Sequence, residues 1–127
     1  MKGRVALWGA FLVAFLVIGW PYWRIPYAQL SLPGSVWGPG LVAVAVLAAL
    51  PVVLAGTSAW ASGLVVGASV PAAILARVAY DVAADPTSHN LWPIELVLAA
   101  GMGLLAGCVG ALAGKALVFL LPGRDDD

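Results

Sequence analysis

The polar residues between Arg77 and Glu95 are those whose types and spacing could do chemistry. One Arg, three acids, one Asn and the chain's single His fall within this stretch of an otherwise apolar sequence. In chain order they are Arg77, Asp81, Asp85, His89, Asn90 and Glu95. Carboxylates and an imidazole can carry a proton or ligate a divalent cation, and an Arg beside an acid can form an ion pair. We call these six residues the polar cluster, a candidate ligand or ion site.

An ion pair is expected at the start of the polar cluster. Arg77 and Asp81 are four residues apart, so they share one face of a helix that continues past residue 80. Pro86 disfavours helical backbone at the residue before it, which predicts that this helix ends at Ala83 or Ala84. The pair therefore falls within the last two turns of its helix.

Helix capping accounts for much of the remaining cluster without any chemistry. Asp85 suits the start of a turn, and Asn90 is a good helix cap. Glu95 falls in the first turn of the next helix, where the dipole stabilises a negative charge by roughly 0.3–1 kcal/mol. The ion pair and His89 are left unexplained by capping.

A metal site or a catalytic site has weaker support in the sequence. One His without a spacing such as H-E-x-x-H is a poor match to metal-binding motifs. Ser88 beside His89 does not show that the two meet as nucleophile and base. Cys108 is the only Cys, which excludes an internal disulfide and offers no metal-type spacing. We therefore predict no metal and no cofactor, and enzymatic activity is the less favoured interpretation.

Composition places these residues in an integral membrane protein. The chain of 127 residues is 63% hydrophobic and 9% charged, against about 45–50% and 25% in soluble domains. Its mean hydropathy is +1.03. Long continuous apolar runs indicate transmembrane helices rather than barrel strands, with the lipid bilayer as the first partner. Six basic and six acidic residues cancel, so there is no basic surface for nucleic acid.

Four apolar segments predict an all-α fold, an integral membrane bundle of four transmembrane helices in a single domain. The expected spans are about 5–22, 40–56, 60–82 and 94–117. Pro51 and Pro71 fall inside the second and third spans, so both of these helices are expected to be kinked. Only the short turn Gly56–Ala59 separates them, which predicts a tight antiparallel hairpin. An interfacial aromatic belt is expected after the first span, at Trp20, Tyr22 and Trp23.

The distribution of Lys and Arg predicts the threading. With four spans both termini share one side, and that side carries more basic residues than the other. The two groups are Lys2, Arg4, Lys115 and Arg124 near the termini, and Arg24 and Arg77 opposite. Basic residues favour the cytoplasmic side, so we predict cytoplasmic termini in a plasma (inner) membrane. The polar cluster then faces the extracytoplasmic side.

A row of small residues marks one face of the last span, at spacings of four, four, three and four. Its members are Ala99, Gly103, Gly107, Gly110 and Gly114, and the third span carries Gly63 and Gly67. Such rows allow two helix backbones to approach closely in lipid. The third span of the same chain is the favoured partner, and the last span of another copy is the alternative.

Three functions remain open at this point. The most favoured is a structural or accessory membrane protein that docks to itself or to a larger membrane complex, because no catalytic set is complete. The alternative is a small ion or solute transporter or channel subunit whose polar cluster forms an extracytoplasmic mouth. Transport would require a homo-oligomer or other complex, since one short chain can hardly enclose a path. A metal-binding membrane enzyme is the least favoured.

Overall fold

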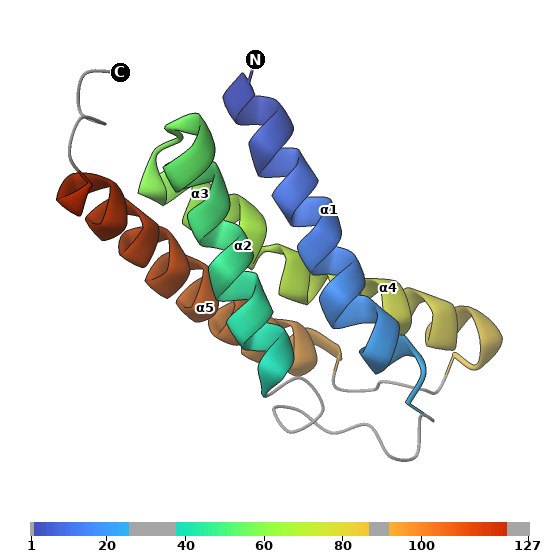
Figure 1. Ribbon diagram of the computed structural model, residues 1–127. Helices are drawn as coiled ribbons and strands as arrows, with labels where there is room; N and C mark the ends of the chain where they lie inside the picture. Colours follow the sequence, from blue (N-terminus) through green and yellow to red (C-terminus); the bar gives the residue numbers. More distant parts are fainter. Residues whose placement is uncertain (1, 26–37, 87–91, 122–127) are drawn as a thin grey trace.

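The computed structural model describes residues 2–25, 38–86 and 92–121, and every regular element in these ranges is an α-helix (Figure 1). The helices are α1 (Lys2–Trp23), α2 (Pro39–Ala55), α3 (Ala59–Gly67), α4 (Ser69–Ala84) and α5 (Trp92–Leu120). Runs of Ala and Leu, which are strong helix formers, favour this outcome. The all-α prediction is confirmed for the described residues.

Three stretches are long and apolar enough to cross a membrane. They are Lys2–Trp23, Ala59–Ala84, which joins α3 and α4, and Trp92–Leu120. The apolar helix α2 continues through Pro51 but has only 17 residues. At 1.5 Å per residue it is about 25 Å long, shorter than the roughly 30 Å hydrocarbon core.

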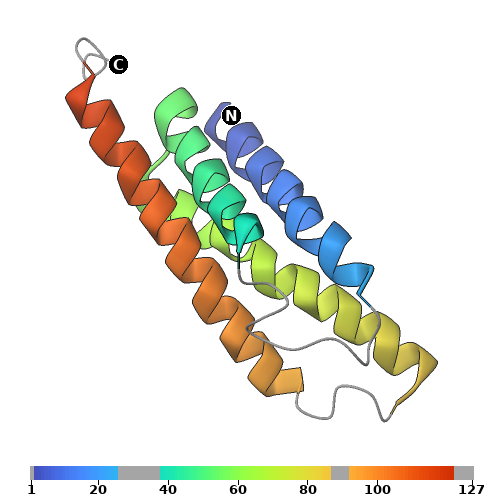
Figure 2. The same cartoon turned by 60° about the horizontal axis from the view of Figure 1, so that its bottom comes forward.

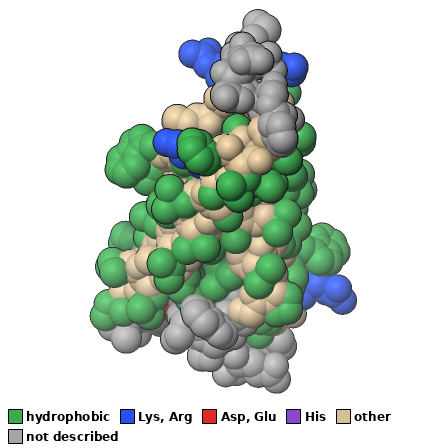
Figure 3. Space-filling view, turned by 60° about the vertical axis from the view of Figure 1, so that its left-hand side comes forward, with side chains coloured by type: hydrophobic (Ala, Val, Ile, Leu, Met, Phe, Trp, Pro, Cys, Tyr) green, Lys and Arg blue, Asp and Glu red, His purple; other side chains and the backbone are tan. Residues whose placement is uncertain are grey.

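Large apolar side chains cover the outside of the helices, as the face in Figure 3 shows. Trp60, Val97 and Phe119 are 75%, 71% and 88% exposed. Soluble monomers rarely expose large continuous apolar surfaces to water, whereas lipid accepts them. The structure therefore indicates a membrane-embedded protein.

The helices run between two ends of the molecule (Figures 1 and 2). The start of α1, the α2–α3 turn and the end of α5 lie toward one end, and the end of α1 and the starts of α2 and α5 lie toward the other. α2 and α5 therefore run parallel, and they form the most extensive helix contact. α3 runs antiparallel to both.

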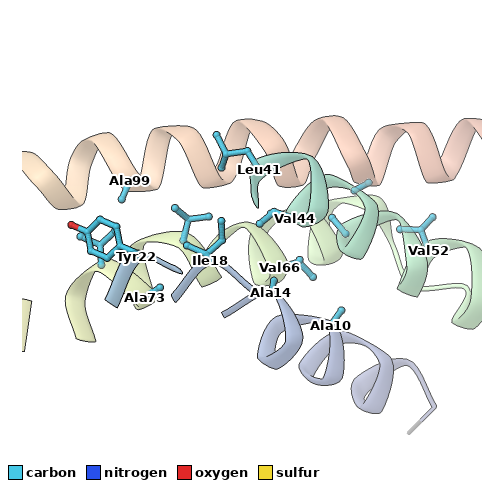
Figure 4. Close-up of a cluster of buried hydrophobic side chains, with 14 of the residues drawn as sticks. Ala10, Ala14, Ile18, Tyr22, Leu41, Val44, Val52, Val66, Ala73 and Ala99 are labelled. Carbon is cyan, nitrogen blue, oxygen red and sulfur yellow. The ribbon is translucent and has the colours of Figure 1, made fainter. Parts of the chain in front are cut away.

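The core consists of small and β-branched side chains (Figure 4). Ala10, Ala14 and Ile18 recur at a spacing of four along the inner face of α1. They belong to one buried cluster with Val44 of α2 and Val66 of α3. Because these side chains are short, neighbouring helices can pack closely in lipid.

The tight α2–α3 turn follows from Gly56 and Ser58. Gly56 has a φ of 68°, which Gly adopts without strain, and its N–H donates to the Pro51 carbonyl. The Ser58 hydroxyl accepts a hydrogen bond from the Ala61 N–H at 3.1 Å and caps α3. The chain is thereby reversed within a few residues.

The third apolar segment is interrupted at Ala68, between α3 and α4. Pro71 has no N–H, so the Gly67 carbonyl four residues earlier lacks its usual helical donor. The Ser69 hydroxyl donates to the Val66 carbonyl at 2.6 Å beside the break. The sequence predicts a kink near Pro71. In the structure the interruption lies three residues earlier, and α4 contacts α1 more extensively than α3 does.

Candidate functional site

Arg77 and Asp81 form a largely buried ion pair on α4. The Arg77 Nε lies 2.7 Å from the Asp81 Oδ2, and the two side chains are 8% and 13% exposed. Their i, i+4 spacing brings the charges together. A buried ion pair also needs further hydrogen bonds to offset the hydration that it loses.

Arg77 obtains those further bonds from the end of α1. Its Nη1 donates to the backbone carbonyls of Tyr22 and Trp23, each at 3.1 Å. These carbonyls belong to the last turn of α1, where a helix lacks intrahelical donors and where the dipole favours a positive charge. Arg77 on α4 thus caps α1.

Trp23 makes a second link between α1 and α4. Its indole Nε1 donates to the Ala73 carbonyl at 3.0 Å. Its ring packs edge-on against Phe15, with 5.2 Å between the ring centroids. The end of α1 is therefore held to α4 by hydrogen bonds that Arg77 of α4 donates to α1 and that Trp23 of α1 donates to α4.

Tyr22 and Glu95 extend this group of polar side chains to three helices. Tyr22 is 2% exposed, and its phenol lies within electrostatic reach of Glu95 as well as of Arg77 and Asp81. Glu95 falls in the first turn of α5. Tyr22 of α1 thus lies within electrostatic reach of charged groups on both α4 and α5.

The remaining members of the polar cluster are placed as follows. Asp85 is the exposed C-cap of α4, and its N–H donates to the Asp81 carbonyl at 2.7 Å. His89 and Asn90 lie outside the described residues. Within the described ranges, no group of three or more His, Cys, Asp or Glu residues is placed to hold a metal ion.

Sequence reasoning did not identify Tyr22 and Trp23 as partners of Arg77, because it assigned them to an interfacial aromatic belt. One signal could have found them. An Arg near the outer end of a span needs acceptors, and the last carbonyls of an adjacent helix are available at that level.

A shallow hollow opens beside the ion pair. Trp23, Ala76, Arg77 and Tyr80 line it, and its volume is about 420 Å³. The Arg77 guanidinium is already bound to one carboxylate and two carbonyls. The hollow therefore offers an anion little net positive charge.

The described interior contains few polar side chains, and the three that are buried as whole residues bond within the protein, whereas the buried Thr57 hydroxyl has no hydrogen-bond partner. The three are Ser62, Ser69 and Arg77. Ser62 donates to the Ala48 carbonyl of α2, and Ser69 donates to the Val66 carbonyl. A proton or ion path needs a series of polar groups across the membrane. The described residues of one chain do not form such a series.

The glycine face of α5 packs first against α3 of the same chain. A Cβ added at Gly107 would lie 2.5 Å from the Gly63 carbonyl oxygen and 2.9 Å from the Gly67 Cα. A Cβ added at Gly67 would lie 2.7 Å from the Gly103 carbonyl oxygen. Such distances leave no room for a side chain, so the two backbones are in direct contact.

Further along, the same face of α5 packs against α2. A Cβ added at Gly114 would lie 2.9 Å from the Ala49 carbonyl oxygen, and one at Gly110 would overlap the Ala45 carbonyl oxygen. Ala99 at the other end of the row is fully buried. The row of small residues therefore contacts two helices in succession.

Trp23→Phe is expected to lower the free energy of unfolding by about 0.6 kcal/mol, the average of side-chain hydrogen bonds measured within membranes. Phe keeps a ring against Phe15 but cannot donate to the Ala73 carbonyl. The measurement is unfolding in detergent micelles. Trp60→Phe is the control, because Trp60 is 75% exposed at the start of α3. Equal losses for the two variants would show that the indole bond contributes nothing specific.

Comparison of the chain with protein families, curated proteins and solved structures finds no match.

Proposed function

We propose that the chain crosses the plasma (inner) membrane four times, with both termini in the cytoplasm. In this arrangement α2 is the fourth span beside the three longer ones. Lys2, Arg4 and Lys115 belong to the starting end of α1 and the finishing end of α5, whereas Arg24 and Arg77 belong to the other end. Basic residues favour the cytoplasmic side, which supports this threading.

We further propose a structural or accessory role, in which the protein docks to itself or to a larger membrane complex. The observation that carries this proposal is the use of Arg77. Its guanidinium binds Asp81 and the end of α1, so the buried charge joins two helices instead of lining a path. A charge committed to such bonds serves the fold.

The outward face of α5 supports docking by close helix packing. Gly101 is exposed, and an added Cβ there would meet nothing within 4 Å. Val97 and Leu105, one turn to either side, are 71% and 63% exposed. A small residue between larger ones lets a second transmembrane helix approach closely.

A transporter or channel subunit is the second candidate. It is favoured by the phenol of Tyr22, which lies within electrostatic reach of Arg77, Asp81 and Glu95, and by the hollow of about 420 Å³ beside Arg77. In this alternative the cluster forms an extracytoplasmic mouth, and an oligomer supplies the path.

The purified protein in liposomes is expected to show no proton or cation flux above that of empty liposomes. In mild detergent the mass of the assembly is expected to exceed the 13.0 kDa of one chain, because a helix of a second chain packs on the outward face of α5. Gly101→Leu should lower that mass, and Ala79→Leu, at an exposed small residue of α4, is the control. Flux that Asp81→Asn abolishes in a folded protein would favour transport instead. A monomer without flux would contradict both proposals.

A further inference from the structure

Two neighbouring hollows of about 460 Å³ and 240 Å³ lie between α1 and α2, and Ala6 and Leu54 line both of them. Because they share these residues, the two hollows together form a groove, near the end of the molecule where α1 begins (Figure 2 shows the course of the two helices). Lys2 lies at the outer end of the groove, and Val13 lies at its inner end. We call this feature the α1–α2 groove.

Small residues on α1 create the α1–α2 groove. Ala6 and Gly9 face Leu50 and Leu54 of α2 across it. A Cβ added at Gly9 would meet nothing within 4 Å, so the space there is open. The walls are otherwise apolar side chains, which suit a hydrocarbon chain.

The length of the groove matches one leaflet of a bilayer. Lys2 and Val13 are eleven residues apart on α1, or about 16 Å at 1.5 Å per residue. Half of the roughly 30 Å hydrocarbon core is about 15 Å. One turn of a helix that is about 10–12 Å wide with its side chains fills roughly 500 Å³, more than the hollow of about 240 Å³ beside Gly9. An acyl chain is the occupant of suitable size.

The charge at the mouth of the groove determines which lipid suits it. Lys2 lines the outer hollow and is exposed, and Arg4 is exposed in the same first turn of α1. The acids among the described residues are Asp81, Asp85 and Glu95, on α4, its C-cap and the first turn of α5, toward the other end of the molecule. A basic residue at the membrane surface attracts anionic headgroups.

We propose that the α1–α2 groove binds one phospholipid with an anionic headgroup. Its acyl chain lies along Ala6, Gly9 and Leu54, and its phosphate pairs with Lys2. The proposal requires that the protein is embedded in a membrane, and it does not depend on docking through α5.

The test is native mass spectrometry of the purified protein, titrated with phosphatidylglycerol or phosphatidylcholine of identical acyl chains. The wild type is expected to bind the anionic lipid more tightly. Lys2→Gln should reduce that preference about fivefold, as expected for one basic residue near an anionic headgroup. Lys115→Gln, an exposed Lys of α5 near the same end, should leave it unchanged.

Gly9→Leu tests the apolar part of the groove. It should weaken binding of both lipids while the protein keeps its helical circular dichroism, because the space at Gly9 is open. Gly101→Leu is the matched control, since its effect falls on assembly mass and leaves lipid binding unchanged. The docking proposal and the lipid proposal can therefore fail separately.

Three results would overturn the lipid proposal. One is equal binding of the two lipids by the wild type. Another is an equal loss of preference in Lys2→Gln and Lys115→Gln, which would indicate a general surface charge. The last is displacement of the anionic lipid by inorganic phosphate alone, together with unchanged binding in Gly9→Leu. That result would assign the affinity to an anion site without a groove.

Discussion

Arg77→Met is expected to lower the free energy of unfolding by about 3–5 kcal/mol, the usual effect of removing one partner of a buried ion pair. Met keeps an unbranched apolar stem but leaves the Asp81 carboxylate, which is 13% exposed, without its cation. The Tyr22 and Trp23 carbonyls lose a donor at the same time. Unfolding in mixed micelles, followed by Trp fluorescence, measures the loss.

Arg24→Met is the matched control for this prediction. Arg24 follows the end of α1 and is exposed, with its guanidinium carbon 5.9 Å from the centre of the Trp20 ring. An exposed cation–π contact contributes about 0.5–1 kcal/mol, so the control should lose no more than that. Arg77→Lys should lose an intermediate amount, because it keeps the charge without the planar fork of donors. Equal losses for the two Met variants would contradict the capping role.

The double variant Arg77→Met, Asp81→Leu divides the effect between its two causes. Replacing both charges also removes the carboxylate that has lost Arg77, and apolar replacements of buried ion pairs are often neutral or stabilising. The loss of unfolding free energy that remains in the double variant then measures the contribution of the hydrogen bonds from Arg77 to the end of α1. Full recovery would mean that the Tyr22 and Trp23 carbonyls do not need Arg77.

The two halves of this site differ in how far the sequence predicts them. The Arg77–Asp81 pair is a local feature, since helical spacing alone places the two side chains on one face. The carbonyls of Tyr22 and Trp23 are 55 and 54 positions away from Arg77. Their contact depends on where α4 is directed after the break at Ala68. Spacing cannot predict that direction, because it results from how extensively α3 and α4 each pack on α1 and α5.

The third apolar segment shows the same limit. Proline at residue 71 predicts a bend from sequence, because the ring removes a backbone donor. Where the helix ends and restarts depends on neighbouring groups that satisfy the freed carbonyls. Here Ser69 donates to Val66 beside the break, and the Gly67 backbone contacts Gly103 of α5. The Gly67–Gly103 contact is long-range and is invisible in a pattern of apolar residues.

The glycine row of α5 identifies a face but not its partner. Periodicity shows that Gly103, Gly107, Gly110 and Gly114 point one way. Only three-dimensional packing shows that the first two meet α3 and the last two meet α2. The sequence favoured the third span as partner of the whole row because the last two spans follow each other as an antiparallel pair, whereas the contact with Ala45 and Ala49 of α2 was not predicted.

Gly110→Ala is expected to lower the free energy of unfolding by about 3 kcal/mol, the upper end of typical overpacking. The added methyl would overlap the Ala45 carbonyl oxygen of α2. That obstacle is backbone and cannot rotate away, so α2 as a whole must move from α5. Because α2 and α5 share the most extensive contact in the protein, the displacement loosens much of the fold. Unfolding in mixed micelles measures the loss.

Gly101→Ala is the control, with the same chemical change on the same helix. A Cβ at Gly101 meets nothing within 4 Å, so no clash opposes the higher helix propensity of Ala. This variant should be neutral or slightly more stable. The difference between the unfolding free energies of the two variants then measures the effect of the close approach of α2, because the change in helix propensity is common to both and cancels. Equal stabilities would mean that α2 and α5 are farther apart in the membrane than the Gly110 contact requires, and the row would then be available to a helix of another chain.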